Sequence, residues 1–454
     1  MKSINPATGE LVREYPLHTP GQVEDILVEA VNAQRGWRQA KVAERTAPLL
    51  RAAELLEERR DELAELAALE MGKPLPQGRA EADKCAWVCR YYAERAESML
   101  ADEPVDTDAY RSLVSYDPLG LVLAVMPWNF PYWQVFRFAA PALAAGNAAL
   151  LKHAPNVPGC AEAIEEIFRA AGLEGPLFRN LLVSEGAVAD LLADSRIAAA
   201  TLTGSVRAGR SVASSAGANL KPTVLELGGS DPYIVLEDAD IERAAETCVE
   251  SRLINSGQSC IAAKRFIAVG EVAGAFTEAV VEKMRAATMG APLEDEAVKI
   301  GPQARRDLRD ELHRQVQVSH EQGARILLGG SIPEGPGAFY PPTVLSGVEP
   351  GTPAGDEELF GPAAAIMTAR NEAHAVELAN DSEFGLGAAV FTSDLERGER
   401  LARSLDAGSA FVNAFVKSDP RLPFGGIKTS GYGRELSTQG IREFTNTKTI
   451  YIAD

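Results

Sequence analysis

With 454 residues, the chain is too long for a single hydrophobic core, so we expect two or three domains. Its composition, 46% hydrophobic and 24% charged, is that of an ordinary globular protein. The net charge of −19 at pH 7 argues against nucleic acid or an anionic membrane as a partner, because their phosphates would be repelled. A small anionic ligand is still compatible, since it needs only a local positive site.

The sequence shows no sign of export or of membrane insertion. Its start, MKSINPATGE, lacks a basic stretch followed by an apolar one. The longest apolar run, at 138–151, falls short of the roughly 20 residues of a membrane span and is broken by Pro and Gly. Five thinly spread cysteines suit a reducing compartment better than a disulfide framework. We therefore expect a cytoplasmic protein.

In the N-terminal half, the sequence pattern changes from helical spacing to alternating strands and helices near residue 109. Residues 22–101 have apolar positions at helical spacing with charges between them, which predicts helices. Residues 111–127 predict two short strands around a Pro-Leu-Gly turn. Strands then alternate with helices, with strands expected at 147–153, 180–183, 197–204 and 223–229, and helices at 131–146, 159–172, 187–194 and 205–217. Such alternation is typical of a parallel sheet covered on both faces.

A second run of strands begins near residue 231 and predicts a second α/β domain. Its strands are expected at 231–240, 264–270, 324–330, 363–369, 387–392 and 408–414, with helices between them. The tail, TKTIYIAD at 447–454, predicts a strand without a local partner, which has to pair elsewhere in the chain.

Glu226 and Cys260 are the first candidates for chemistry. Glu226 lies in LELGG, at the end of an apolar strand, where ligands of open α/β sheets usually bind. The double glycine behind it allows a backbone or a cofactor to approach closely. Cys260 lies in the small polar loop LINSGQSCIA, where a thiol can meet a ligand. A glutamate that merely emerges at a strand end and a buried inert cysteine are the structural alternatives.

The other four cysteines fit helical packing: Cys85, Cys89, Cys160 and Cys248. The Cys-x-x-x-Cys pair has no second pair to complete a zinc site, so no metal is expected. The five histidines lie in strand-end or polar surface contexts, which gives a Cys–His hydrolase little support.

A carboxylate base with an amide as oxyanion donor fits better. The amide candidate is Asn129 in MPWNFPYW, where Pro131 restrains the loop, although a simple turn asparagine is the local alternative.

Two segments suit a nucleotide. In LTGSVRAG a strand runs into Gly204 and Ser205 and then into a helix whose first N–H groups can face a pyrophosphate. It is not the full G-x-G-x-x-G pattern. Lys152 ends a second strand and can reach ribose hydroxyls, or simply cap the strand in solvent.

Taken together, these segments resemble the aldehyde dehydrogenase superfamily over nearly the whole chain. The motifs occur in the family's order and spacing: NPATGE, PWNFP, LLKHAP, TGSVRAG, LELGG, GQSC, EELFGP and PFGGIKTSGYGRE. The resemblance implies that Cys260 attacks the aldehyde carbon and that the Asn129 amide and the Cys260 N–H hold the oxyanion. Hydride transfer then leaves a thioester, for which Glu226 activates the hydrolytic water.

The resemblance also implies a cofactor site made of Trp128, Lys152, Gly204, Ser205, Glu358 and Phe360. NAD-preferring members often place Glu three residues after the cofactor lysine, and this chain has Pro155 there. Both NAD and NADP are therefore possible cofactors, and we expect a preference for NAD.

Within the superfamily, the chain is most similar to succinate-semialdehyde dehydrogenases of the short bacterial type with KHAPN. The family's substrate-carboxylate arginine corresponds to Arg137, and Arg suits carboxylates bidentately. A packed arginine without a substrate role is the alternative. Some members have a second substrate arginine where this chain has Ile254. Arg252 is nearby, but its side chain need not point inward.

The implied fold is α/β and aldehyde dehydrogenase-like, with a Rossmann-type parallel-sheet cofactor domain, a catalytic domain and a small oligomerisation arm. We expect the NAD(P)-binding domain at 1–105 and 119–229, the catalytic domain at 230–430, and oligomerisation segments at 106–118 and 435–454. The expected partners are an aldehyde with a terminal carboxylate and further copies of the chain, as a homodimer or homotetramer. Three alternatives are the same chemistry on another aliphatic aldehyde, a cofactor-free cysteine hydrolase, and a non-catalytic structural or binding protein with this fold.

Overall fold

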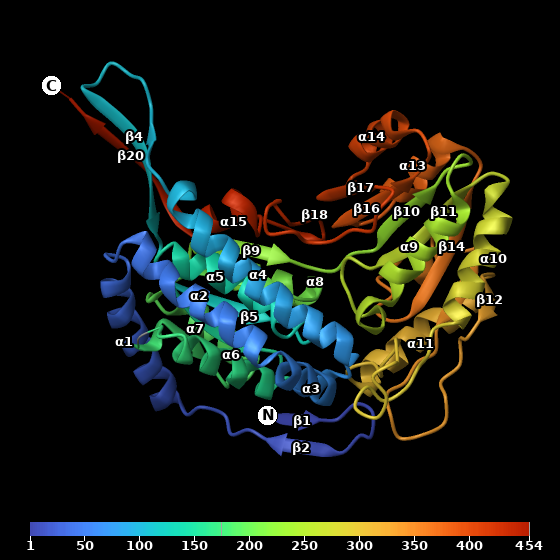
Figure 1. The fold of residues 1–454 in the computed structure, drawn as a ribbon, viewed down its shortest axis with the longest axis horizontal. Coiled ribbons are helices and arrows are strands. Elements are labelled where there is room, and N and C mark those ends of the chain that lie inside the picture. Colours follow the sequence, from blue (N-terminus) through green and yellow to red (C-terminus); the bar gives the residue numbers. More distant parts are fainter. Residues whose placement is uncertain (174, 454) are drawn as a thin grey trace.

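The computed structural model describes residues 1–173 and 175–453. Two large sheets lie side by side, and a narrow arm projects from one end, where the C-terminus lies (Figure 1). The expected α/β architecture is therefore present. No helix in the described part of the chain combines the length and the apolar character needed to cross a membrane.

The chain begins with a hairpin and four helices. The antiparallel hairpin is β1 (Lys2–Ile4) with β2 (Leu11–Glu14). The helices predicted within 22–101 are α1 (Pro20–Trp37), α2 (Val42–Glu58), α3 (Arg60–Met71) and α4 (Leu75–Met99). Thr19 starts α1 with a capping box, in which its hydroxyl accepts from the N–H of Gln22.

The first large sheet has the strand order β19-β9-β8-β5-β6-β7, and only β19 runs antiparallel to its neighbour. Its strands are β5 (Leu121–Met126), β6 (Ala148–His153), β7 (Phe178–Asn180), β8 (Ile197–Thr203), β9 (Thr223–Glu226) and β19 (Gly431–Tyr432). The helices between them are α5 (Trp133–Ala144), α6 (Pro158–Ala170), α7 (Ala187–Ala193) and α8 (Val206–Ala218).

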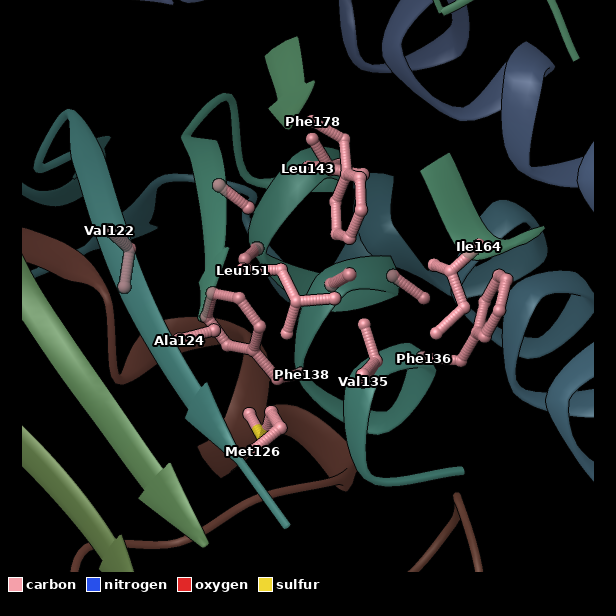
Figure 2. Close-up of a cluster of buried hydrophobic side chains, with 14 of the residues drawn as sticks. Val122, Ala124, Met126, Val135, Phe136, Phe138, Leu143, Leu151, Ile164 and Phe178 are labelled. Carbon is pink, nitrogen blue, oxygen red and sulfur yellow. The ribbon is translucent and has the colours of Figure 1, made fainter. Parts of the chain in front are cut away.

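The core of this region lies where α5 meets the sheet (Figure 2). Every residue of α5 is buried, because sheet strands contact one side and α2 and α4 contact the other. Phe136 stacks on Phe168 of α6 with ring centroids 4.9 Å apart, and Phe168 in turn meets Phe178 at 4.7 Å. This packing holds α5 rigidly, and α5 carries Arg137.

The second large sheet has the order β12-β13-β14-β11-β10-β16-β17, with only β12 antiparallel. Its strands are β10 (Asp231–Val235), β11 (Ala263–Val269), β12 (Arg325–Leu328), β13 (Thr343–Ser346), β14 (Ala363–Ala369), β16 (Gly387–Phe391) and β17 (Ser409–Val412). The helices of this half are α9 (Ile241–Leu253), α10 (Val272–Arg285), α11 (Arg306–Glu321), α12 (Pro353–Asp356), α13 (Glu372–Asn380) and α14 (Leu395–Ser404). A small sheet pairs β15 (Phe384–Gly385) with β18 (Ile427–Lys428).

The C-terminal strand predicted at 447–454 pairs with a strand of the projecting arm. After α15 (Ser437–Arg442), β20 (Thr445–Ile452) runs antiparallel along the whole of β4 (Arg111–Pro118), from Thr445 opposite Pro118 to Ile452 opposite Arg111. The short β3 (Glu103–Pro104) lies on the other edge of β4. Residue 454, the last of the predicted strand, lies outside the described residues.

Three strand predictions were wrong in detail. The strand expected at 231–240 is β10, which ends at Val235, because only 231–235 pair with β11. The strand expected at 180–183 is β7, which ends at Asn180, because only 178–180 pair with β6. The strand expected at 223–229 ends at Glu226, since the two glycines leave the sheet and lead to β10. This connection joins the two large sheets at the predicted boundary near 229, while the division into domains itself stays a prediction.

A buried ion pair anchors the start of α5. The Glu81 carboxylate on α4 accepts hydrogen bonds from the N–H groups of Tyr132 and Trp133, both 2.8 Å. It also pairs with Lys73, whose side chain is fully buried and lies 4.0 Å from the centroid of the Phe130 ring. A carboxylate at a helix N-terminus satisfies free N–H groups and favours the helix dipole.

We expect Glu81→Ala to lower the free energy of unfolding by about 3–5 kcal/mol, because it leaves Lys73 as an uncompensated buried charge. Urea titration followed by tryptophan fluorescence measures the effect. The control is Glu97→Ala, which removes an exposed carboxylate from the same helix. Equal stabilities of the two variants would contradict this role for the ion pair.

Candidate active site

Four neighbouring parallel strands of the first sheet end at one edge, in the order β9, β8, β5 and β6. Carboxyl ends of parallel strands are where open α/β sheets bind ligands. Six of the predicted site residues lie at this edge: Trp128 and Asn129 after β5, Lys152 in β6, Gly204 and Ser205 after β8, and Glu226 at the end of β9. The fold thus brings together residues that are far apart in sequence.

The Cys260 loop connects α9 to β11 and has an unusual backbone. Asn255, Ser256 and Gly257 all have positive φ, at 55°, 57° and 78°. A Cβ on Gly257 would lie 2.2 Å from the carbonyl carbon of Gly361, so only glycine fits there. Left-handed asparagine and serine store strain, which the surrounding contacts have to offset.

Lys264 of β11 is one source of those contacts. Its ammonium group, 1% exposed, donates to the carbonyl oxygens of Ser259 at 2.9 Å and Cys260 at 2.6 Å. It also lies 3.5 Å from the Glu358 carboxylate. The lysine therefore fixes the backbone on either side of the candidate nucleophile.

Arg252 contacts the same loop at Gly257. Its side chain is fully buried, and Nη2 donates to the Gly257 carbonyl at 2.5 Å. Ile254, in contrast, lines the large cavity in front of Cys260. Arg252 therefore stabilises the loop. Neither Arg252 nor Ile254 provides a second arginine for the substrate.

The Cys260 side chain lines a cavity of about 730 Å³, together with Phe130, Trp133, Arg137 and Phe424. Burial raises the pKa of the thiol to about 12, against the smaller opposing effects of Lys264 and Arg137. The thiol is therefore neutral at pH 7 in the ligand-free protein, and its attack on a carbonyl needs a proton acceptor. The other four cysteines are fully buried in the hydrophobic cores, as expected for packing residues.

Asn129 is tied to the Cys260 loop in two ways. Its side-chain amide donates to the Gln258 carbonyl at 3.0 Å, and its own carbonyl accepts from the Asn255 amide at 2.6 Å. A carboxamide has two N–H groups, so one of them is left for a ligand. Asn129 is only 4% exposed, which strengthens any hydrogen bond it makes to an oxyanion.

Glu226 is 2% exposed, and neither carboxylate oxygen has a hydrogen-bond partner among the described residues. Burial raises its pKa, Glu435 adds to the rise, and Arg137 opposes it. Oε1 would lie 2.8 Å from a Cβ on Gly425, so glycine leaves the room that the carboxylate occupies. A buried carboxylate with a raised pKa and no fixed partner is suited to moving a proton.

Arg137 lines the cavity but is not free. Its Nε lies 2.5 Å from the Glu435 carboxylate, and Nη2 donates to the Thr203 hydroxyl at 3.3 Å. The guanidinium carbon also lies 4.9 Å from the centroid of the Phe424 ring. Sequence reasoning missed Glu435, because nothing in GYGRE shows that its glutamate meets a residue of α5.

The double glycine of LELGG lies in close contact with the Cys260 loop and with Glu358. A Cβ on Gly229 would lie 2.8 Å from the carbonyl oxygen of Cys260, and one on Gly228 would lie 2.4 Å from Oε2 of Glu358. The N–H of Gly229 donates to Glu358 at 3.0 Å. The close approach predicted for these glycines is thus a packing contact with the Cys260 loop and with EELFGP.

Several cofactor candidates have chemical features that suit a dinucleotide. Lys152 is 4% exposed, and burial lowers its pKa. Ser205 is the N-cap of the 13-residue helix α8, whose first turn faces the same sheet edge. The rings of Trp128 and Phe360 meet edge to face with centroids 5.7 Å apart. A buried cation, a helix N-terminus and an aromatic pair match the charges and rings of NAD(P).

Three relatives are similar over nearly their full length. A Synechocystis sp. protein, named as a probable succinate-semialdehyde dehydrogenase with NADP(+) in its name, is 51% identical over 451 residues, 99% of each chain. The Escherichia coli protein named succinate semialdehyde dehydrogenase, with NAD(P)+ in its name, is 49% identical over 99% of this chain and 97% of its own. A crystal structure of succinic semialdehyde dehydrogenase from Streptococcus pyogenes in complex with NADP+ is 37% identical, covers 100% of both chains and has a TM-score of 0.97.

These names do not support the expected preference for NAD, since NADP occurs in all three. They do agree with the resemblance found in the motifs. The model of the aldehyde dehydrogenase family matches residues 1–450. The chain therefore belongs to the aldehyde dehydrogenase family.

Proposed function

We propose that this protein oxidises succinate semialdehyde to succinate with NAD(P)+, through a thioester on Cys260. The observation that carries the proposal is one cavity lined by both Cys260 and Arg137, with Asn129 hydrogen-bonded to the Cys260 loop and Glu226 buried at the end of β9. The names of the relatives supply the substrate, and Arg137 supplies a reason for its terminal carboxylate to bind here.

In the proposed mechanism, Cys260 attacks the aldehyde carbon as a thiolate, and its proton passes to water in the cavity. The free N–H of the Asn129 amide donates to the new oxyanion, a contact worth about 3–4 kcal/mol in comparable sites. The cofactor, when bound, accepts the hydride. Glu226 then takes a proton from water as the water attacks the thioester, which releases the acid and regenerates the thiol.

Lys152, Ser205, Glu358 and the Trp128–Phe360 pair would hold the cofactor. We propose that NADP+ serves at least as well as NAD+, because Lys152 is cationic and Pro155 carries no carboxylate to repel a 2′-phosphate. We also propose that the arm of β3, β4 and β20 joins copies of the chain, and that the protein is cytoplasmic.

Oxidation of another aliphatic aldehyde is the second candidate. It is favoured by the Arg137–Glu435 ion pair, which leaves the guanidinium partly neutralised before any substrate binds. The ratio of kcat/KM for succinate semialdehyde and butanal separates the two. A ratio near one would support the uncharged substrate.

Replacement of the nucleophile tests the chemistry. We expect Cys260→Ala to lower kcat by at least about 10³-fold, because no other thiol lines the cavity among the described residues. Cofactor binding, followed by quenching of tryptophan fluorescence, should be unchanged. Cys248→Ala is the control, since it removes a fully buried packing thiol. Substantial turnover by Cys260→Ala would contradict the mechanism.

Glu226→Gln should keep a burst of reduced cofactor but slow steady-state turnover by about 10²–10⁴-fold, because Glu226 acts only in thioester hydrolysis in this mechanism. The raised pKa means that Glu226 is largely protonated near neutral pH and becomes a base as pH increases. Wild-type kcat should therefore rise through the neutral range, and the rise should be absent in the variant. Stopped-flow absorbance measures both, and loss of the burst would contradict a purely hydrolytic role.

The cofactor proposal is tested by Pro155→Glu at an exposed position. The new carboxylate should raise KM for NADP+ by at least about tenfold through repulsion of the 2′-phosphate, and change KM for NAD+ little. Pro155→Gln is the uncharged control. If the wild type used NAD+ much better than NADP+, the proposal would be wrong.

A further inference from the structure

Lys84 lines the same cavity as Cys260 and Arg137, and neither the motifs nor the mechanism above use it. It comes from the middle of α4, which packs along α5. Its ammonium group donates to the Ser418 hydroxyl at 2.8 Å and lies 4.2 Å from the centroid of the Trp133 ring. These two contacts fix the end of a flexible side chain in the wall of the cavity.

The charge of Lys84 is not compensated by a carboxylate. The ion pairs found among residues 1–173 and 175–453 include none to this lysine. The two carboxylates that affect the pKa of Lys84 form ion pairs with other residues. Glu81 pairs with Lys73, and Asp419 pairs with Arg421. Arg137 differs, since Glu435 already balances its guanidinium.

The surroundings disfavour this charge. Burial and, to a smaller extent, the positive charge of Arg137 lower the pKa of Lys84 to about 8, against the opposing effects of Cys85, Glu81 and Asp419. A cation that is poorly solvated and faces a cavity gains most from an anion that enters the cavity. An anionic group of the substrate would therefore be held most strongly between Lys84 and Arg137.

We propose that Lys84 binds the terminal carboxylate of the substrate together with Arg137 and is the main source of selectivity for carboxylated aldehydes. Lys84 thus supplies, from α4, the second cation that Ile254 does not provide. This inference rests on the proposed function, in which the aldehyde carries a carboxylate and reacts at Cys260.

The test compares Lys84→Met with Lys84→Arg, each with succinate semialdehyde and with butanal, an uncharged aldehyde of the same chain length. Lys84→Met should raise KM for succinate semialdehyde by about tenfold or more and change KM for butanal less than about twofold. Lys84→Arg keeps the charge and should restore most of the selectivity. Unchanged butanal turnover in Lys84→Met shows that the variant is folded.

Lys283→Met is the matched control, because Lys283 lines the same cavity but is paired with Glu242 at 3.1 Å. It should leave both KM values nearly unchanged. If Lys283→Met and Lys84→Met raise KM equally, the effect is a general loss of positive potential, and the assignment to Lys84 is overturned.

Titration provides a second readout. Wild-type KM for succinate semialdehyde should rise above about pH 8, as Lys84 loses its proton, and KM for butanal should not. In Lys84→Arg this rise should disappear, since a guanidinium stays protonated. A wild type that does not prefer succinate semialdehyde over butanal would overturn the proposed substrate. A wild type that prefers it, with the preference intact in Lys84→Met, would overturn only the role of Lys84.

Discussion

The site depends on a steric constraint at Gly228 and Gly229. These residues lead from β9 of one large sheet to β10 of the other, and neither has room for a side chain. Because they carry none, the carbonyl of Cys260 and the carboxylate of Glu358 lie directly against the connection. The nucleophile's loop is thereby held against the edge at which the strands of the first sheet end.

Burial then determines the protonation of the groups collected there. It raises the pKa of Cys260 and of Glu226, and it lowers that of Lys84, so each group is shifted toward its neutral form. At neutral pH the ligand-free site therefore holds a neutral Cys260 thiol and a largely protonated Glu226, while Lys84 keeps most of its positive charge. Binding of an anionic substrate changes this balance on the cavity side, while Glu226 keeps the capacity to accept a proton later in the reaction.

Much of the fold and of the candidate site could be predicted from the sequence, because buried parallel strands and amphipathic helices have distinct hydrophobic patterns. The strand ends that carry Lys152 and Glu226 were predicted within a few residues. A polar loop at Cys260 was also predicted, but the left-handed backbone of that loop was not. The strand at 180–183 was misplaced, since its limits are set by pairing with β6 and not by its own residues. Glu435 and Lys84 were missed for a related reason: each acts through contacts with distant elements, and a charged residue on a helix or after a turn has no local mark of burial.

In the proposed reaction, the substrate's acyl group becomes attached to Cys260, and Glu226 is needed for its release. The most direct test mixes Glu226→Gln with succinate semialdehyde and NADP+, quenches the reaction in acid and analyses the digested protein by mass spectrometry. We expect one succinyl group on the peptide that contains Cys260, and none when the cofactor is omitted. A succinyl group on another peptide, or no covalent product despite formation of reduced cofactor, would contradict it.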